Sequence, residues 1–161
     1  MIDLILHDSA ARPGVFFWFG ALPASQIEDW ERENSICVPA DLKTLWSLKG
    51  GGDLFESETI LQPFGSAEYD LIDPVTQVYR ERGLSDEFRM FQTGCVESVF
   101  RISDGALFSL VNPDENCQMI QHADLEQWYK STIRKLFAGK YDLPALADGP
   151  NEPWERWHRL L

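Results

Sequence analysis

The chain has 161 residues, of which 44% are apolar, and it includes 10 Phe, 6 Trp and 4 Tyr. This length and composition fit one globular domain and exclude an intrinsically disordered chain. The 26 acidic residues exceed the 14 Lys and Arg residues and give a formal net charge of −12. Because such a field repels phosphate backbones, we expect no direct binding to nucleic acid and favour a basic protein partner.

Nothing in the chain predicts export or membrane insertion. The N-terminus lacks the basic segment of a secretion signal. The most apolar run, at 15–22, reads as a core strand with its turn and is far shorter than the roughly 20 residues that cross a bilayer. Cys37, Cys95 and Cys117 show no tight spacing, so we expect reduced, mostly buried thiols and a cytoplasmic location.

Three helices are predicted in the first half of the chain. The first begins at Ser25, which forms a capping box pattern with Glu28. Pro39 suits the first position of the second helix, which ends at the glycines 50–52. A third helix runs from the Asp-Pro pair at 73–74 to Gly83. The apolar stripe of the second helix consists of Leu42, Leu45 and Trp46.

Short extended segments follow the helices. Strands are expected at 57–64, 88–92, 96–103, 106–111 and 117–121. Asp104 and Gly105 predict a two-residue hairpin loop, because both central positions of such a loop need positive φ. Residues 112–116 predict a longer turn. Consecutive short loops make this sheet an antiparallel meander.

The predicted fold class is α+β, a single domain in which helices pack mainly on one face of the meander sheet. A fourth helix is expected to begin at Asp124, with Gln127 completing a capping box. The domain spans 1–161, with its core at about 14–139. Residues 140–161 are expected to form an extension that packs on the domain through Trp154, Trp157 and Leu161. The apolar face of the fourth helix consists of Leu125, Trp128, Tyr129, Ile133 and Leu136.

No catalytic constellation is visible. His7, His122 and His158 lie far apart, and H-E-x-x-H, C-x-x-C and G-x-S-x-G are all absent. His122 is expected to form hydrogen bonds at a strand–helix junction. The glycines at 50–52 follow a helix and precede Asp53, which indicates a helix stop and not a phosphate loop. We therefore expect no catalytic residue, metal or cofactor; an unrecognised enzyme would require a deep pocket with convergent polar groups.

Unbalanced negative charge falls in two windows. Residues 50–79 contain six acidic side chains and no Lys or Arg, and residues 102–129 contain five and again no Lys or Arg. Elsewhere acidic residues alternate with basic ones, as in the ERE and RER triplets at 31–33 and 80–82. This distribution favours a directed acidic surface over general solubility, provided that the two windows meet in space.

The segment 27–65 resembles the SUKH superfamily, which includes fungal cell-wall-synthesis regulators and many bacterial immunity proteins. Its first helix, its P-x-D segment and its glycine pair match in register, with Gly50 in place of the usual Asn. The resemblance implies an α+β domain without family-wide catalytic residues or cofactor. The matched positions include Ile27, Trp30, Glu31, Val38, Pro39, Asp41, Leu45, Trp46, Gly51, Gly52 and Phe55.

Bacterial members look like antidotes that block a co-produced toxin, often a nuclease, and this implies a non-catalytic immunity protein. The alternative of the same fold is an intracellular adaptor or regulator without a toxin. Only Glu31 among the matched positions is a candidate for binding. We predict that acidic side chains pair with Lys or Arg on a basic toxin domain. The predicted partner-binding residues are Glu56, Glu58, Glu68, Asp104, Asp114 and Glu115.

Overall fold

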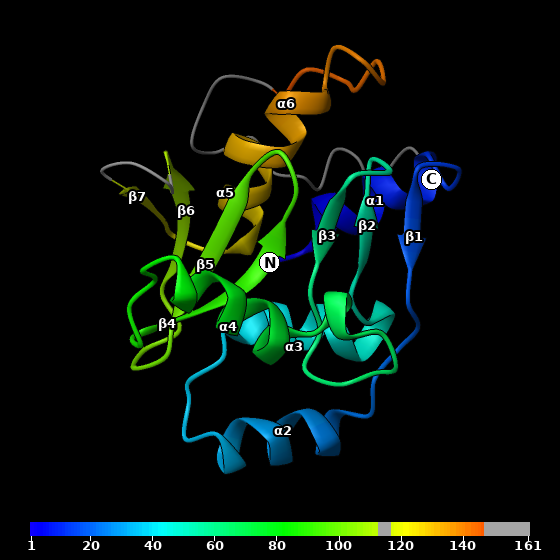
Figure 1. Ribbon diagram of the computed structural model, residues 1–161. Coiled ribbons are helices and arrows are strands. Elements are labelled where there is room, and N and C mark those ends of the chain that lie inside the picture. The colour runs from blue at the N-terminus through cyan, green and yellow to red at the C-terminus, as the bar shows by residue number, and fades with distance from the viewer. Residues whose placement is uncertain (113–116, 147–161) are drawn as a thin grey trace.

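The computed structural model describes residues 1–112 and 117–146 and shows an α+β fold. Its sheet has seven antiparallel strands that lie side by side in sequence order, as Figure 1 shows. The predicted antiparallel meander is therefore confirmed. The strands are β1 (Phe16–Trp18), β2 (Gly52–Leu54), β3 (Glu58–Ile60), β4 (Phe88–Thr93), β5 (Glu97–Arg101), β6 (Leu107–Val111) and β7 (Gln118–His122).

In the view of Figure 1 the helices lie behind the sheet and around its lower end, except for α6, which lies at its upper end. In that view α1 and α5 lie behind the strands, and α2 and α3 lie below them. The helical elements are α1 (Asp3–Ala11), α2 (Ala24–Glu33), α3 (Ala40–Lys49), the 3-10 helix η1 (Glu68–Asp70), α4 (Ile72–Glu81), α5 (Leu125–Tyr129), the π-helical segment η2 (Lys130–Arg134) and α6 (Lys135–Phe137).

Helix α1 was not predicted, and it corrects the expected start of the core at residue 14. Leu4 and Ile5 are buried in the main apolar cluster. Glu126, on α5, accepts a hydrogen bond from the backbone N–H of Leu4 at 3.2 Å. Helices α1 and α5 are far apart in the sequence but pack against one another. The first residues therefore belong to the domain core.

Helices α2 and α3 follow the predicted pattern, with a correction at each N-terminus. Helix α2 begins at Ala24 with Pro23 as its cap, and no side chain caps it, so the predicted box of Ser25 and Glu28 is wrong. The entry of the chain is fixed instead by a bond from the Leu22 N–H to the Trp46 carbonyl. Helix α3 begins at Ala40 with Pro39 as its N-cap, one position before the predicted place of Pro39 inside the helix, and it buries the predicted apolar stripe of Leu42, Leu45 and Trp46.

Of the three glycines after α3, the first ends the helix and the last begins a strand that was not predicted from the sequence. Gly50 adopts φ 77°, which explains the helix stop. Gly52 then opens β2, which lies between β1 and β3. A Cβ on Gly51 would lie 2.5 Å from the Ile60 carbonyl oxygen, and one on Gly52 would lie 2.7 Å from that of Phe17. Only glycine permits strands to approach this closely here.

Helix α4 lies beside the part of β4 that β3 does not reach. The β3 ladder reaches only Ile60, so the predicted strand at 57–64 is shorter than expected. Further along β4, the Met90 N–H donates to the Thr76 hydroxyl of α4 at 3.0 Å. A side chain of α4 thus satisfies a backbone donor that β3 no longer reaches.

The turn between β5 and β6 is longer than the predicted two-residue loop. Arg101 pairs with Ala106, which leaves residues 102–105 in the turn. Gly105 has φ 72°, whereas Asp104 is not in the positive-φ region. The cause is tertiary, because the Ile102 carbonyl accepts from the Cys37 N–H at 2.7 Å. The predicted turn at 112–116 begins at Asn112, and its residues 113–116 lie outside the described residues.

The fourth predicted helix is present but changes register in its middle. Asp124 accepts from the Gln127 N–H at 2.8 Å, and Gln127 bonds back to the Ala123 N–H, which confirms a reciprocal cap. In η2 the helix widens to a π turn, which inserts one extra residue. Leu136 is consequently 52% exposed, contrary to prediction, and Phe137 is 8% exposed.

This register shift predicts that two neighbouring substitutions change the free energy of unfolding by very different amounts. Phe137 stacks on Phe55 with ring centroids 5.1 Å apart. Phe137→Ala should therefore lower the free energy of unfolding by about 3–5 kcal/mol, the range for a buried aromatic residue. Leu136→Ala should change it by at most about 0.5 kcal/mol. Urea unfolding followed by circular dichroism measures both, and equal losses would contradict the π-helical register.

No helix in residues 1–112 and 117–146 combines the length and the apolar character needed to span a membrane. The predicted packing of Trp154, Trp157 and Leu161 lies outside the described residues. The extension nevertheless contributes to the core at its beginning. Leu143 is buried, and Tyr141 stacks on Phe55 with a centroid distance of 5.3 Å.

Candidate functional site

The predicted acidic residues do not form one surface, because the meander places them at opposite ends of the sheet. Alternate turns of an antiparallel meander lie at opposite ends. The turn between β2 and β3 carries Glu56 at the upper end in Figure 1. The β5–β6 turn with Asp104, and η1 with Glu68, lie at the lower end. Asp114 and Glu115 lie outside the described residues.

Glu58 is a correction to the predicted partner-binding set, since its side chain is fully buried. It points to the core face of β3, and its carboxylate accepts hydrogen bonds from Gln92 Nε2 and from the Cys95 N–H, both at 2.9 Å. The Val96 N–H lies within 3.4 Å of the same group. Glu58 therefore fixes the β4–β5 turn from inside the molecule and offers no charge to a partner.

The buried network continues from Glu58 toward α5. Gln92 Oε1 accepts from the Ser98 hydroxyl at 3.0 Å, and Ser98 Oγ accepts from the Trp128 indole N–H at 2.9 Å. This chain of hydrogen bonds links β3, β4, β5 and α5. Each of these side chains has a hydrogen-bond partner, and a connected buried network of this kind stabilises the fold.

Glu56 and Asp104 are exposed, but each is engaged within the chain. Glu56 accepts from the Tyr141 hydroxyl at 2.9 Å. Asp104 receives two bonds from the Arg101 guanidinium, at 2.9 and 2.6 Å. The Arg101 side chain and the Ala106 N–H lower the pKa of Asp104 to about 2. Since this folded pKa is depressed, Asp104 stays charged, and its pairing persists, until the pH falls toward 2.

A cleft lies between the α2–α3 connection, the β5–β6 turn and the β7–α5 junction. Its volume is about 890 Å³. Glu31 and Lys43 lie in its lining and bond to one another at 2.9 Å, and Glu31 also accepts from the Val38 N–H at 2.7 Å. Glu31 thus connects α2 to α3, which gives this family-matched position a role in the scaffold. Within this lining Glu31 and Lys43 neutralise one another, as in a structural ion pair.

The first acidic window contains further acidic groups that the predicted set omitted. Asp53, on β2, accepts from the Thr59 hydroxyl at 2.6 Å. The pKa of Asp70, in η1, is raised by partial burial and by the negative charge of Asp53. The Asp70 carbonyl accepts from the Gln62 N–H at 2.9 Å, and the Gln62 side chain accepts from the Gly51 N–H at 3.0 Å. The 3-10 helix η1 therefore lies beside the start of β2, the strand that carries Asp53. The sequence pointed to both residues, because they lie in the window without Lys or Arg. Only the fold shows that their segments lie next to one another.

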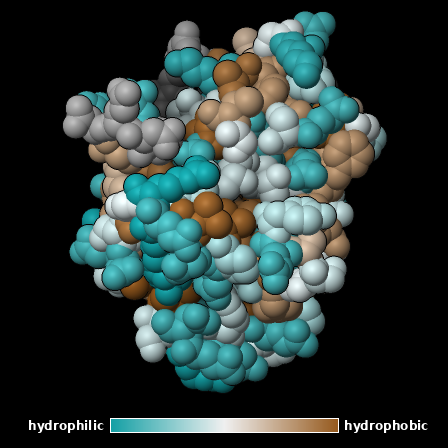
Figure 2. All heavy atoms as spheres, in the orientation of Figure 1, coloured by the Kyte–Doolittle hydropathy of each residue, from teal (hydrophilic) through white to brown (hydrophobic). Residues whose placement is uncertain are grey.

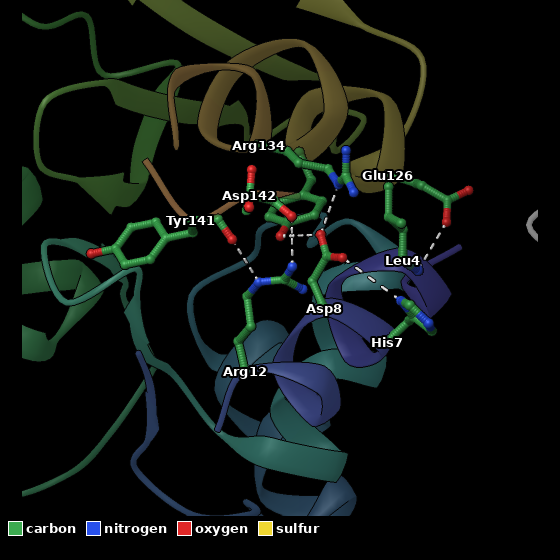
Figure 3. Close-up of polar contacts among 9 residues, drawn as sticks. Leu4, His7, Asp8, Arg12, Glu126, Arg134, Tyr141 and Asp142 are labelled. Carbon is green, nitrogen blue, oxygen red and sulfur yellow. Dashed lines mark hydrogen bonds and ion pairs between the residues drawn. The ribbon is translucent and has the colours of Figure 1, made fainter. Parts of the chain in front are cut away.

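A buried ion pair connects α1 to the C-terminal helices, as Figure 3 shows. Asp8 Oδ2 accepts from Arg134 Nε and from the Tyr129 hydroxyl, both at 2.8 Å. His7 also points toward Asp8, with Nδ1 3.7 Å from Oδ1. Burial and the adjacent Asp8 charge raise the pKa of Tyr129. Asp8, Tyr129 and Arg134 are all buried, so this cluster has the form of a structural anchor.

Within the described residues, which do not include His158, the histidine and cysteine residues show no reactive grouping. His122 forms hydrogen bonds to the Ser109 hydroxyl at 2.6 Å and the Ser131 hydroxyl at 3.3 Å, as predicted for a junction residue, and burial lowers its pKa. All three cysteines are free and exposed, so the expectation of buried thiols is wrong. Within residues 1–112 and 117–146, no cluster of His, Cys, Asp and Glu has the arrangement of a metal site.

Comparisons with known proteins add no relative. No protein-family model matches the chain, and no curated protein matches it.

Proposed function

We propose that this protein is a non-catalytic immunity protein that binds a basic toxin domain inside the producing cell. The observation that carries the proposal is the large excess of negative charge, −12 over the chain, with two windows that contain no Lys or Arg. A field of this kind accelerates encounter with a positively charged protein.

Two further points support a binding role over an enzymatic one. The buried polar groups around Glu58 and Asp8 have partners inside the fold, so they strengthen the scaffold. The resemblance of 27–65 to the SUKH superfamily favours neutralisation of a toxin, and a nuclease fits best because an active site for nucleic acid is itself basic.

The test is capture followed by rescue. Affinity-tagged protein is used to isolate its partner from the native cell, and the captured protein is then expressed in a susceptible host with and without this chain. We expect growth arrest without the chain, growth with it, and an association rate that falls steeply between low and physiological salt, because steering is screened over about 8–10 Å. An uncharged or acidic partner, or arrest that the chain fails to relieve, would refute the proposal.

A further inference from the structure

In the part of the chain that the structure describes, one face of the strands β1, β2 and β3 carries exposed and half-buried side chains, and we define it as the outer face. The register pairs Phe17 with Asp53, and Asp53 with Thr59, so these three side chains lie in one row on the same side of the sheet. Phe19 lies on this side too, since its ring packs over the backbone at Gly51. The opposite side carries Phe16, Leu54 and Ile60, which are buried in the core.

Large aromatic side chains are exposed on the outer face and in the neighbouring 3-10 helix η1. Phe17 is 49% exposed and Phe19 is 38% exposed. Tyr69, next to Asp70 in η1, is 77% exposed. Within the described part of the chain, these three are the large exposed aromatic residues. Figure 2 shows apolar surface at the right margin of the molecule, where Figure 1 places β1.

Charge that no cation of the described residues neutralises lies beside these rings. The ion pairs among residues 1–112 and 117–146 include neither Asp53 nor Glu68 nor Asp70. Asp104, in contrast, is already held by Arg101. The repulsion between Asp53 and Asp70 would be relieved by a cation placed between them.

We propose that the outer face is the docking site, and that it receives arginine side chains from the surface of a protein partner. Arginine satisfies both features at once, because its planar guanidinium stacks on aromatic rings and pairs with carboxylates. A second copy of this chain is a poorer occupant, because its own outer face would bring like charges together. This inference rests on the proposed function and locates its interface away from the predicted Glu56 and Asp104.

The test uses short peptides as probes, so it does not require the partner. The ¹⁵N-labelled full chain is titrated with acetylated, amidated tetra-arginine, and separately with tetra-lysine of the same charge. We expect the largest amide shifts at residues 16–19, 51–54 and 68–71, and tighter binding of tetra-arginine. Equal binding of the two peptides, or largest shifts at 102–105, would overturn the proposal.

Substitutions that keep the net charge separate the contribution of aromatic stacking to arginine binding from that of general electrostatic attraction. The double substitution Phe17→Ser and Tyr69→Ser leaves the net charge unchanged and should weaken tetra-arginine binding about fivefold to tenfold, since each exposed cation–π contact contributes a factor of about two to five. Leu136→Ser, at an equally exposed apolar site on α6, is the control and should change nothing. Spectral dispersion confirms that each variant is folded.

Experiments with the captured partner test the docking site and the immunity function separately. If the partner binds the Phe17→Ser, Tyr69→Ser variant as tightly as the unaltered chain, the outer face is wrong and the immunity function stands. If the chain rescues no host from the captured protein, the immunity function fails, and the peptide titration still decides whether the outer face binds arginine.

Discussion

Replacement of Asp8 by alanine is expected to lower the free energy of unfolding by about 3–5 kcal/mol, the range for breaking a buried ion pair. Asp8 is fully buried and accepts hydrogen bonds from Arg134 and Tyr129. Without it, the Arg134 guanidinium would remain in the interior without its counter-charge. The measurement is equilibrium unfolding in urea at neutral pH, and a loss below about 1 kcal/mol would contradict the assignment of Asp8 as an anchor.

A double substitution provides the control for this prediction. Replacing both partners, with Asp8→Ala and Arg134→Met, removes the buried charge together with its counter-charge. Such a pair is expected to lose less stability than the sum of the two single substitutions, because no uncompensated ion remains. Additive losses would show that the two side chains act independently, in disagreement with the contact of 2.8 Å between them.

Replacement of Glu58 by alanine is expected to cost about 2–4 kcal/mol of stability. The backbone N–H groups of Cys95 and Val96 would lose their acceptor, and each unsatisfied donor costs about 1–3 kcal/mol. Glu58→Gln retains one carbonyl oxygen and should lose less. Thermal or urea unfolding measures these differences.

Glu56 provides a matched control two residues away. It is exposed, and its contact is with the Tyr141 hydroxyl at the surface. Glu56→Ala should change the free energy of unfolding by about 0.5 kcal/mol or less. Both residues were predicted to face a partner, so a large loss for Glu58 with almost none for Glu56 would confirm that only one of them belongs to the surface. Equal effects would contradict the burial of Glu58.

The meander could be predicted from the sequence because its signals are local. Extended segments of alternating character between short turns predict neighbouring antiparallel strands, and β4 to β7 follow this pattern. Helix α3 could be predicted equally well, because its apolar stripe of Leu42, Leu45 and Trp46 has helical spacing. Strand β2 was hidden, since its Gly-Asp-Leu sequence has little extended propensity and depends on the close approach of β1 and β3.

The candidate site was less predictable than the fold. The acidic windows identified which segments carry excess charge, but a window in sequence contains residues that point in opposite directions. Glu58 points inward and Asp53 points outward, because alternate side chains of paired strands project to opposite faces. Phe17 and Phe19 are exposed, whereas Phe16 is buried and Trp18 is half-buried, in a run that was predicted to be a core strand.

By itself the amino-acid sequence determined the fold class, the antiparallel order of β4 to β7 and the excess of negative charge, since these depend on local periodicity and composition. Only the tertiary structure decided which charges remain at the surface. Burial and pairing depend on residues distant in the chain: Cys95 and Gln92 satisfy Glu58, and Arg134 satisfies Asp8 across more than a hundred residues. No pattern within a single segment can report such contacts.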